Sequence, residues 1–286
     1  MSLKVCMLGS GSSGNSTLIA SATTGILLDA GLSARRITER LAQTGMPVGE
    51  LNAICVSHEH QDHTRGLRIL NRKHGIPVYA NVGTVDALSR SDELSALPWT
   101  LFTTGHAFPV GDLIIEPFSV PHDAYDPVGF IVTGGGVRVG VVTDMGMATS
   151  LIRERLRCCH AVVVESNYDE KMLQEAQRPW ALKQRIRGRQ GHLSNQGSAQ
   201  LLAEIAGPEL RRVYLAHISE ECNRHDIALE ITRTALAKAG CQHVEVSVGY
   251  PDRISEMWES HGAARTEAET IATETVVRDC FPHVGS

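Results

Sequence analysis

Three histidines and two carboxylates stand within seven residues of this sequence, in the segment Ser57-His-Glu-His-Gln-Asp-His63. Histidine nitrogens and carboxylate oxygens are common protein ligands of zinc, manganese and iron. The segment directly follows an apolar run, residues 51–56, that is typical of a buried strand. At this spacing two metal ions could share four ligands, which are His58, His60, Asp62 and His63.

Two metal ions need further ligands, and three candidates each stand at the end of a strand-like run. They are His122, Asp144 and His217. Because sites in open α/β sheets gather at the carboxyl ends of the strands, we expect these side chains to meet there. Each alone could equally be a capping or core residue, but their agreement favours a metal site. Glu59 is not expected to be a ligand, since the alternation that aims His58 and His60 one way aims Glu59 elsewhere.

Short apolar runs and amphipathic stretches are mixed along the chain. Strands are predicted at residues 3–7, 17–20, 25–29, 53–56, 77–80, 101–103, 113–119, 130–133, 137–143, 161–165 and 212–216. Helices are predicted at residues 34–43, 64–74, 82–89, 150–157, 195–206 and 226–239. This mixture predicts an α/β fold with two sheets sandwiched between helices. We expect one catalytic domain over residues 1–258 and a polar tail over residues 259–286, helical or disordered.

Charge and composition restrict the partners and the compartment. The net charge of −5 over 286 residues provides no overall attraction to nucleic acid or membrane, so any nucleic-acid binding needs a local basic patch. No apolar run approaches the roughly 20 residues of a membrane span, and no signal peptide is recognisable. Seven cysteines without a C-x-x-C pair indicate a reducing, cytoplasmic protein without a disulfide framework.

A glycine-rich turn near the N-terminus, Gly9-Ser-Gly-Ser-Ser-Gly14, has the spacing of a dinucleotide-binding loop. Such a loop should open a helix, but residues 15–25 are β-branched, small and polar, which predicts a hairpin instead. We therefore expect no nucleotide cofactor. The turn is either a plain tight turn or a turn beside an active site whose amides can meet a phosphate.

In chain order, Leu27-Leu-Asp-Ala-Gly31, the segment 57–63, His122, Thr143-Asp144 and His217 resemble the metallo-β-lactamase fold. The resemblance covers about residues 3–255 and implies an αββα four-layer sandwich with a dinuclear metal site. It implies that one metal is bound by His58, His60 and His122, and the other by Asp62, His63 and His217. Asp144 would bridge the two ions, and Asp29 would hold the ligand loop from behind. The ligand set admits two divalent ions per chain, zinc or manganese, and is also compatible with iron.

The segment Gly191-His-Leu-Ser-Asn195 resembles the histidine loop of phosphodiesterases of this fold. That resemblance makes His192 a general acid or a phosphate contact. Ser194 or Asn195 can cap the helix that follows, and the free amides of a helix start can also bind phosphate.

Upstream lies a strip of four cations within seven residues, Lys183, Arg185, Arg187 and Arg189. The strip is either a solvated face or a set of contacts to the phosphates of a nucleic acid. Trp180 stands just before it, and we expect it in the core, with base stacking as the alternative.

A wider combination, residues 10–16, 122–127, 165–167, 179–186 and 191–195, resembles the YycJ/WalJ-type branch of the fold. This branch is associated with 5′→3′ exonuclease action on DNA and with DNA repair. The resemblance implies that a metal-bridging hydroxide attacks the phosphodiester, with catalytic roles for Asp62, Asp144 and His192. The alternative is a hydrolase of small esters, thioesters or lactones, which would use the same metals without needing His192 or the cation strip. The sequence does not settle DNA against RNA or the oligomeric state.

Overall fold

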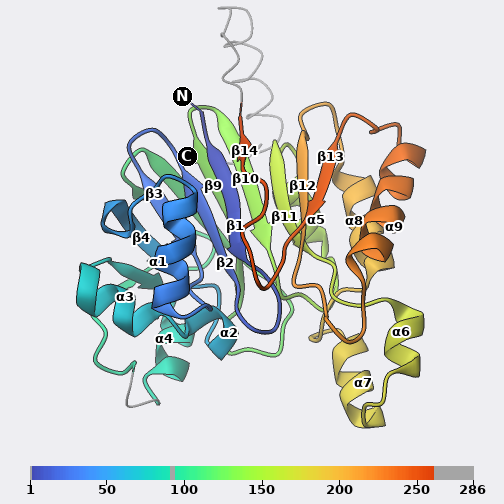
Figure 1. The fold of residues 1–286 in the computed structure, drawn as a ribbon, viewed down its shortest axis with the longest axis horizontal. Coiled ribbons are helices and arrows are strands. Elements are labelled where there is room, and N and C mark those ends of the chain that lie inside the picture. Colours follow the sequence, from blue (N-terminus) through green and yellow to red (C-terminus); the bar gives the residue numbers. More distant parts are fainter. Residues whose placement is uncertain (1, 91–93, 261–286) are drawn as a thin grey trace, which may run out of the picture.

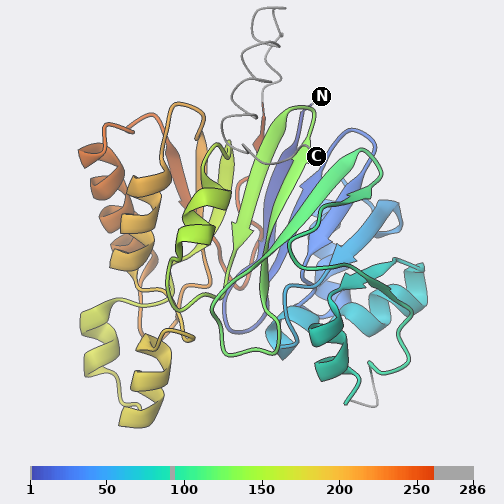
Figure 2. The ribbon, with the colours of Figure 1, turned by 180° about the vertical axis from the view of Figure 1, so that it is seen from behind.

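The computed structural model describes residues 2–90 and 94–260. Two seven-stranded sheets pack face to face, and helices cover the outer face of each (Figures 1 and 2). The predicted αββα sandwich is therefore confirmed.

The first sheet is built mainly from the N-terminal part of the chain, in the order β14-β1-β2-β3-β4-β5-β6. Its strands are β1 (Lys4–Gly9), β2 (Ser16–Ala20), β3 (Gly25–Leu28), β4 (Leu51–Cys55), β5 (Val78–Ala80), β6 (Trp99–Leu101) and β14 (Trp258–Glu259). Its helices are α1 (Ala34–Gln43), the 3-10 turn η1 (Val48–Glu50), α2 (Gln61–Thr64), α3 (Leu67–His74) and α4 (Val82–Leu88). The strands from β3 to β6 are parallel, so their carboxyl ends share one edge of the sheet.

The second sheet has the order β13-β12-β11-β10-β9-β8-β7. Its strands are β7 (Phe108–Val110), β8 (Leu113–Ser119), β9 (Val128–Gly134), β10 (Val137–Val142), β11 (Ala161–Glu165), β12 (Arg212–Ala216) and β13 (Glu245–Val248). The helices of this half are α5 (Ser150–Leu156), α6 (Glu170–Glu175), α7 (Trp180–Arg187), α8 (Asn195–Ile205) and α9 (His225–Lys238). Helices α6 and α7 project beyond the strand ends as an arm, residues 169–190 (Figure 1).

One predicted helix is interrupted in the structure, so its prediction as a single helix is wrong. The sequence favours a single helix over residues 64–74, whereas the chain forms α2 and α3 with a break at Gly66. A Cβ at Gly66 would lie 2.6 Å from the carbonyl oxygen of Leu32, and the Gly66 amide donates to Ala30. Because Gly66 has no Cβ, the backbone at the break packs closely against residues 30–32. A continuous helix would prevent this contact. The elements that were not predicted, β7, β13, β14, α6 and α7, are mostly too short to show a clear hydrophobic period.

Apolar side chains between the sheets fix their relative position. This central core includes Val5, Ile19, Phe130, Val139 and Tyr214, all almost fully buried. Burial of such side chains is the main stabilising contribution to folding. With the sheets fixed in this way, the loops after β3, β4, β8, β10, β11 and β12 meet at a common edge of the sandwich, as the contacts between their side chains show.

The structure describes only the first two residues of the predicted tail, Glu259 and Ser260. Of the predicted tail, Glu259 pairs with Lys4 and Ser260 accepts a hydrogen bond from the Leu3 amide, while the remainder, residues 261–286, lies outside the described residues.

Six cysteines fall within the described residues, and all six are free thiols. Among the described helices, none has the length and apolar character needed to cross a membrane.

Candidate metal centre

Three imidazoles from two loops meet at one side of the site. His58 and His60 leave the end of β4, and His122 follows β8. The ring nitrogens His58 Nε2 and His60 Nδ1 lie 3.1 Å apart, and His122 Nε2 lies 3.3 Å from the same nitrogen of His60. Burial lowers the pKa of His60 and holds that of His58 well below its usual range, so both rings are neutral, as metal ligands must be.

A second group forms around one carboxylate oxygen. Asp62 Oδ2 lies 3.4 Å from His63 Nε2 and 3.5 Å from His217 Nε2. His217 follows β12 and adopts a left-handed backbone conformation, with φ of 52°, directly after the strand ends. The structure thus brings together Asp62 and His63, from the loop after β4, and His217, which stands more than 150 residues later in the chain.

Asp144 lies between these two groups. Its Oδ2 is 3.0 Å from His63 Nε2, and its Oδ1 is 3.8 Å from His122 Nε2. Within this cluster, Asp144 Oδ2 and His217 Nε2 are buried and form no hydrogen bond of acceptable geometry with the described residues, although His63 Nε2 lies close to Asp144 Oδ2. Leaving buried polar atoms unpaired is costly, so two such atoms in one cluster call for a bound species. All seven predicted ligands converge here, and their donor chemistry fits divalent metal ions.

The electric field of the cluster also favours a cation. Burial alone would lower the pKa of His63, yet Asp29 and Asp144 raise it well above its usual value. Burial would raise the pKa of Asp144, but His217 and His63 hold it well below its usual range. The carboxylates are therefore ionised and stabilise positive charge at the centre of the cluster.

Asp29 holds the ligand loop from behind. Directly after β3 it adopts a φ of 63°, which turns its carboxylate towards the loop after β4. The carboxylate accepts hydrogen bonds from the Ser57 amide at 2.7 Å and from His63 Nδ1 at 2.8 Å. Because Nδ1 of His63 donates its hydrogen bond to Asp29, Nε2 of His63 is left to face the cluster.

The glycine-rich turn braces the ligands. It joins β1 to β2, which pair antiparallel. The hairpin predicted from residues 15–25 is confirmed, because β2 continues through a short turn into the antiparallel strand β3. Asn15 Nδ2 lies 3.2 Å from Asp62 Oδ2, and Ser10 Oγ accepts the His217 amide at 2.7 Å. At Gly14, with φ of 149°, a Cβ would lie 2.6 Å from the carbonyl oxygen of Gly31, so only glycine allows this approach. Sequence analysis assigned no role to Asn15 or Ser10.

Glu165 is the main functional residue that sequence analysis missed. It ends the apolar strand β11 and is fully buried. Its Oε1 accepts from Nδ1 of His192 at 2.7 Å and from Nδ1 of His217 at 2.9 Å. Its Oε2 accepts from the amides of Leu193 and Met145. Burial would raise the pKa of Glu165, but His192 lowers it, so the carboxylate is charged. The available signal was a lone acid at the end of an apolar strand.

The cluster lines a cavity of about 260 Å³ at the edge of the sandwich. His192 lies in its wall, together with Arg178 and Arg185 from the arm. Arg185 pairs with Asp123 at 2.5 Å, and Arg178 pairs with Glu221 at 2.5 Å. Each ion pair connects the arm to a loop that carries a candidate ligand, since Asp123 follows His122 and Glu221 stands shortly after His217.

Other predicted phosphate contacts lie elsewhere. The Ser194 hydroxyl caps α8 by accepting from the Gly197 amide, and the Asn195 side chain is fully buried against Ser166 and Asn223. The geometry therefore gives no support to a phosphate role for these two side chains. Three cations of the strip lie on the arm outside the cavity lining, and they are Lys183, Arg187 and Arg189.

Trp180 is 70% exposed at the start of α7, so its expected place in the core is wrong. The ring lies at the surface of the arm because α6 and α7 project from the sandwich (Figure 1).

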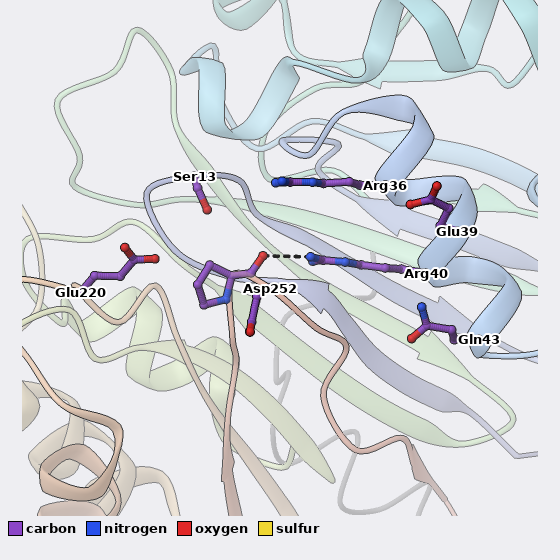
Figure 3. A pocket seen from close by; sticks show the side chains of 8 residues that line it. Ser13, Arg36, Glu39, Arg40, Gln43, Glu220 and Asp252 are labelled. Carbon is purple, nitrogen blue, oxygen red and sulfur yellow. Dashed lines mark hydrogen bonds between the residues drawn. The ribbon is translucent and has the colours of Figure 1, made fainter.

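A larger cavity, of about 410 Å³, lies beside the glycine-rich turn at Ser13 (Figure 3). Arg36 and Arg40 extend into it from α1, opposite Ser13. The Arg40 guanidinium is buried and donates to the carbonyl oxygens of Leu8 and Pro251, at 2.6 and 3.0 Å. Arg40 thus joins α1 to the end of β1 and to the segment before β14.

Comparison with known proteins identifies the family. Residues 24–218, more than half of the chain, match the family described as beta-lactamase superfamily domain. The chain belongs to this family. The metal-dependent hydrolase predicted from the ligand set is the enzyme class of this family, so that prediction is confirmed.

Two relatives are similar over most of their length. The chain is 32% identical to exodeoxyribonuclease YycJ of Bacillus anthracis, over 84% of this chain and 91% of that protein. It is 34% identical to exodeoxyribonuclease WalJ of Streptococcus pneumoniae serotype 2 (strain D39), over 82% of this chain and 89% of that protein. The predicted similarity to the YycJ/WalJ branch is confirmed.

A solved structure shares the fold at low sequence identity. The metallo-beta-lactamase fold protein YhfI of Bacillus subtilis superposes with a TM-score of 0.69 at 16% identity, over 91% of this chain and 99% of that one. At this identity the similarity concerns the fold alone.

Proposed function

We propose that this protein is a two-metal phosphodiesterase that removes nucleotides from DNA in the 5′→3′ direction. The observation that carries the proposal is His192, which the buried Glu165 holds in the wall of the ligand cavity beside two arginines. Cleavage of a phosphodiester releases an alkoxide, which is poorly stabilised, beside charged phosphates. An imidazole and two guanidinium groups at one place suit this reaction. The names of the relatives, both exodeoxyribonucleases, support DNA as the substrate.

Seven residues would hold the metal ions. His58, His60 and His122 would bind one ion, Asp62, His63 and His217 the other, and Asp144 would contact both. Zinc or manganese suits this set, and iron is compatible with it. When bound, the ions supply a hydroxide nucleophile at neutral pH and offset the charge of the phosphate.

His192 supplies a proton to the leaving oxygen. His192 Nδ1 donates a hydrogen bond to Glu165, which fixes the ring and leaves Nε2 for the substrate. An alkoxide leaves readily only when it is protonated as the bond breaks, and a positioned imidazolium provides that proton. The same carboxylate orients His217, so one buried acid positions both the proton donor and a ligand.

The arginines bind the phosphates that flank the scissile bond. Arg178 and Arg185 line the cavity, and their partners Glu221 and Asp123 keep the guanidinium groups in place. Lys183, Arg187 and Arg189 follow along the arm and would contact phosphates further from the reaction. The predicted cytoplasmic location, which rests on cysteine usage, is part of this proposal.

The test is cleavage of a 5′-phosphorylated, end-labelled DNA duplex by metal-stripped protein, with zinc and manganese added back separately. We expect stepwise loss of nucleotides from the 5′ end with at least one metal, and no loss with Asp62→Ala. Circular dichroism and metal content of the variant show whether it folds and whether it loads metal. Absence of DNA cleavage together with hydrolysis of a small ester, thioester or lactone would overturn the proposal in favour of the small-molecule alternative.

A further inference from the structure

A row of exposed polar side chains begins beside the metal ligands and follows α2 and α3. The backbone stays in the right-handed helical region through the break, at Arg65 and Gly66, so residues three and four apart lie on one face. Four exposed residues have this spacing, and they are Gln61, Arg65, Arg68 and Arg72. The buried face carries Leu67 and Leu70, which pack in the core. The row therefore faces solvent and leads from the ligand segment along α3.

The segment that carries this row is strongly basic. Between Asp62 and Asp86 the chain has no carboxylate, although its net charge is −5. The same stretch has four lysine or arginine residues, all of them exposed, and they are Arg65, Arg68, Arg72 and Lys73. A local basic surface of this kind attracts a polyanion, which the net charge of the chain does not.

Arg65 connects the row to the ligand cavity. It stands three residues after Asp62, and its Nη1 donates to the carbonyl oxygen of Ser13 at 3.3 Å. The neighbouring residue, Ser12, lines the cavity. A guanidinium group has five N–H donors, so Arg65 can hold the glycine-rich turn and a phosphate at the same time. A strand with one phosphate in the cavity would therefore meet Arg65 where it leaves past Ser12.

The row and the arm belong to different halves of the molecule. Helices α2 and α3 cover the first sheet, whereas the arm belongs to the second, and both views show them on opposite sides of the strand ends (Figures 1 and 2). The cavity is lined from both halves, by Ser12 and His60 from the first and by Arg178 and Arg185 from the second. A substrate seated in the cavity thus has a basic segment on either side.

The length of the row suits the backbone of a duplex. At a rise of about 1.5 Å per residue, Arg65 and Arg72 stand about 10 Å apart along the helix axis. A DNA duplex presents about one phosphate charge per 1.7 Å, which is about six charges over that length. Each of the three arginines can therefore meet a different phosphate.

We propose that α2 and α3 form a second DNA-binding surface, on which Arg65, Arg68 and Arg72 contact phosphates of the duplex beyond the cleavage site. This inference rests on the proposed function and adds to it the path that the duplex follows. Phosphate contacts of this kind set the position of the duplex without reading its sequence. The arm and this surface would then hold the DNA from two sides while its end lies at the metal ions.

The experiment measures how duplex binding depends on salt, because each neutralised phosphate adds about 0.9 to the slope of log affinity against log salt. The probe is a 20-base-pair duplex with a 3′ fluorescein and phosphorothioate linkages at its 5′ ends, which resist cleavage by the metal-loaded protein. Anisotropy gives Kd between about 0.05 and 0.2 M salt. For the double variant Arg68→Ala/Arg72→Ala we expect the slope to fall by about 1.8, which is a roughly 60-fold rise in Kd at 0.1 M relative to 1 M salt.

Two single variants accompany the double variant. Arg65→Ala should lose about 0.9 of the slope, and Arg65→Lys should keep it, because the charge remains. A merely structural role of the guanidinium at Ser13 would not be rescued by lysine. Arg211→Ala is the matched control, since Arg211 is exposed before the amino end of β12, at the other edge of the sandwich from His217. It should change neither slope nor Kd.

Cleavage of an unmodified duplex by the wild-type protein separates this inference from the proposed function. Cleavage together with unchanged slopes in Arg65→Ala and in the double variant would overturn the surface alone. Binding that depends on the row, without any cleavage, would overturn the exonuclease proposal and support the surface. An equal loss of slope in Arg211→Ala would also overturn the surface, because the effect would then follow net charge. Absence of both binding and cleavage would overturn both proposals.

Discussion

Two cavities border the glycine-rich turn, and they differ in how their polar groups are satisfied. Ser12 lines the smaller cavity with the metal-ligand cluster, and Ser13 lines the larger one beside α1. In the larger cavity Arg40 donates to two carbonyl oxygens, and Glu39 pairs with Arg35. In the smaller cavity, by contrast, side chains from four loops converge, and two buried polar atoms among the described residues have no partner.

The difference supports the proposed active site in the smaller cavity. Volume alone would favour the other cavity, since the larger one is about 410 Å³ and the smaller about 260 Å³. The chemistry of the lining favours the smaller one, because two unpartnered buried atoms lie there among seven side chains of the types that bind metal ions. Substitutions in the smaller cavity should therefore reduce activity, and substitutions in the larger one should reduce stability or have no effect.

Asp62→Ala should have the largest effect. Removing this carboxylate takes away the oxygen on which His63 and His217 converge, and with it several kcal/mol of charge stabilisation. We expect DNA cleavage to fall at least about 1000-fold, at tenfold per 1.4 kcal/mol. Steady-state kinetics and metal analysis check this, with circular dichroism for the fold. Full activity of the variant would remove Asp62 from the metal centre.

Glu165→Gln should have the next largest effect. The amide cannot accept both imidazole protons and both backbone amides, so His192 and His217 lose their fixed orientation. We expect metal affinity or kcat to fall about 10- to 100-fold, as for other residues that orient ligands. Titration with zinc in a competing chelator separates affinity from kcat. A variant that keeps both within twofold would show that the imidazoles are positioned without Glu165.

Asp62 and Glu165 also show which parts of the site could be predicted from the sequence. Asp62 was predictable because the ligand segment is contiguous, and its spacing after an apolar strand carries the chemistry. Glu165 was not, because its role depends on contacts with His192 and His217, which lie 27 and 52 residues away. Trp180 was misplaced for a related reason: an aromatic residue is usually buried, and nothing in the sequence shows that α6 and α7 leave the sandwich.

Arg185→Ala should have a moderate effect on substrate binding. The guanidinium lines the cavity, held by Asp123, and a charged hydrogen bond to phosphate contributes about 1.5–3 kcal/mol. We expect KM for DNA to rise roughly 10- to 100-fold. Lys183→Ala should raise KM less, because Lys183 lies outside the cavity lining, further from the reaction, and donates to the Gln174 carbonyl oxygen. A larger effect of Lys183 than of Arg185 would place the phosphate path on the outer face of the arm.

Arg40→Met should reduce stability more than activity. It leaves the carbonyl oxygens of Leu8 and Pro251 without their donor, at a cost of about 1–3 kcal/mol each where water cannot replace it. The melting temperature should fall by several degrees while kcat/KM at 25 °C changes little. Differential scanning calorimetry beside an activity assay measures both. A loss of activity larger than the loss of stability would connect the larger cavity to catalysis through the glycine-rich turn.

Arg36→Ala should have the smallest effect and is the most direct test of the difference between the two cavities. The side chain is exposed at the rim of the larger cavity, and substitutions at such positions usually change stability by no more than about 0.5 kcal/mol. We expect both the melting temperature and kcat/KM for DNA to stay at the wild-type values. If DNA cleavage fell while hydrolysis of bis(p-nitrophenyl) phosphate did not, the larger cavity would belong to the path of the substrate. The glycine-rich turn would then lie beneath a DNA strand that contacts both cavities.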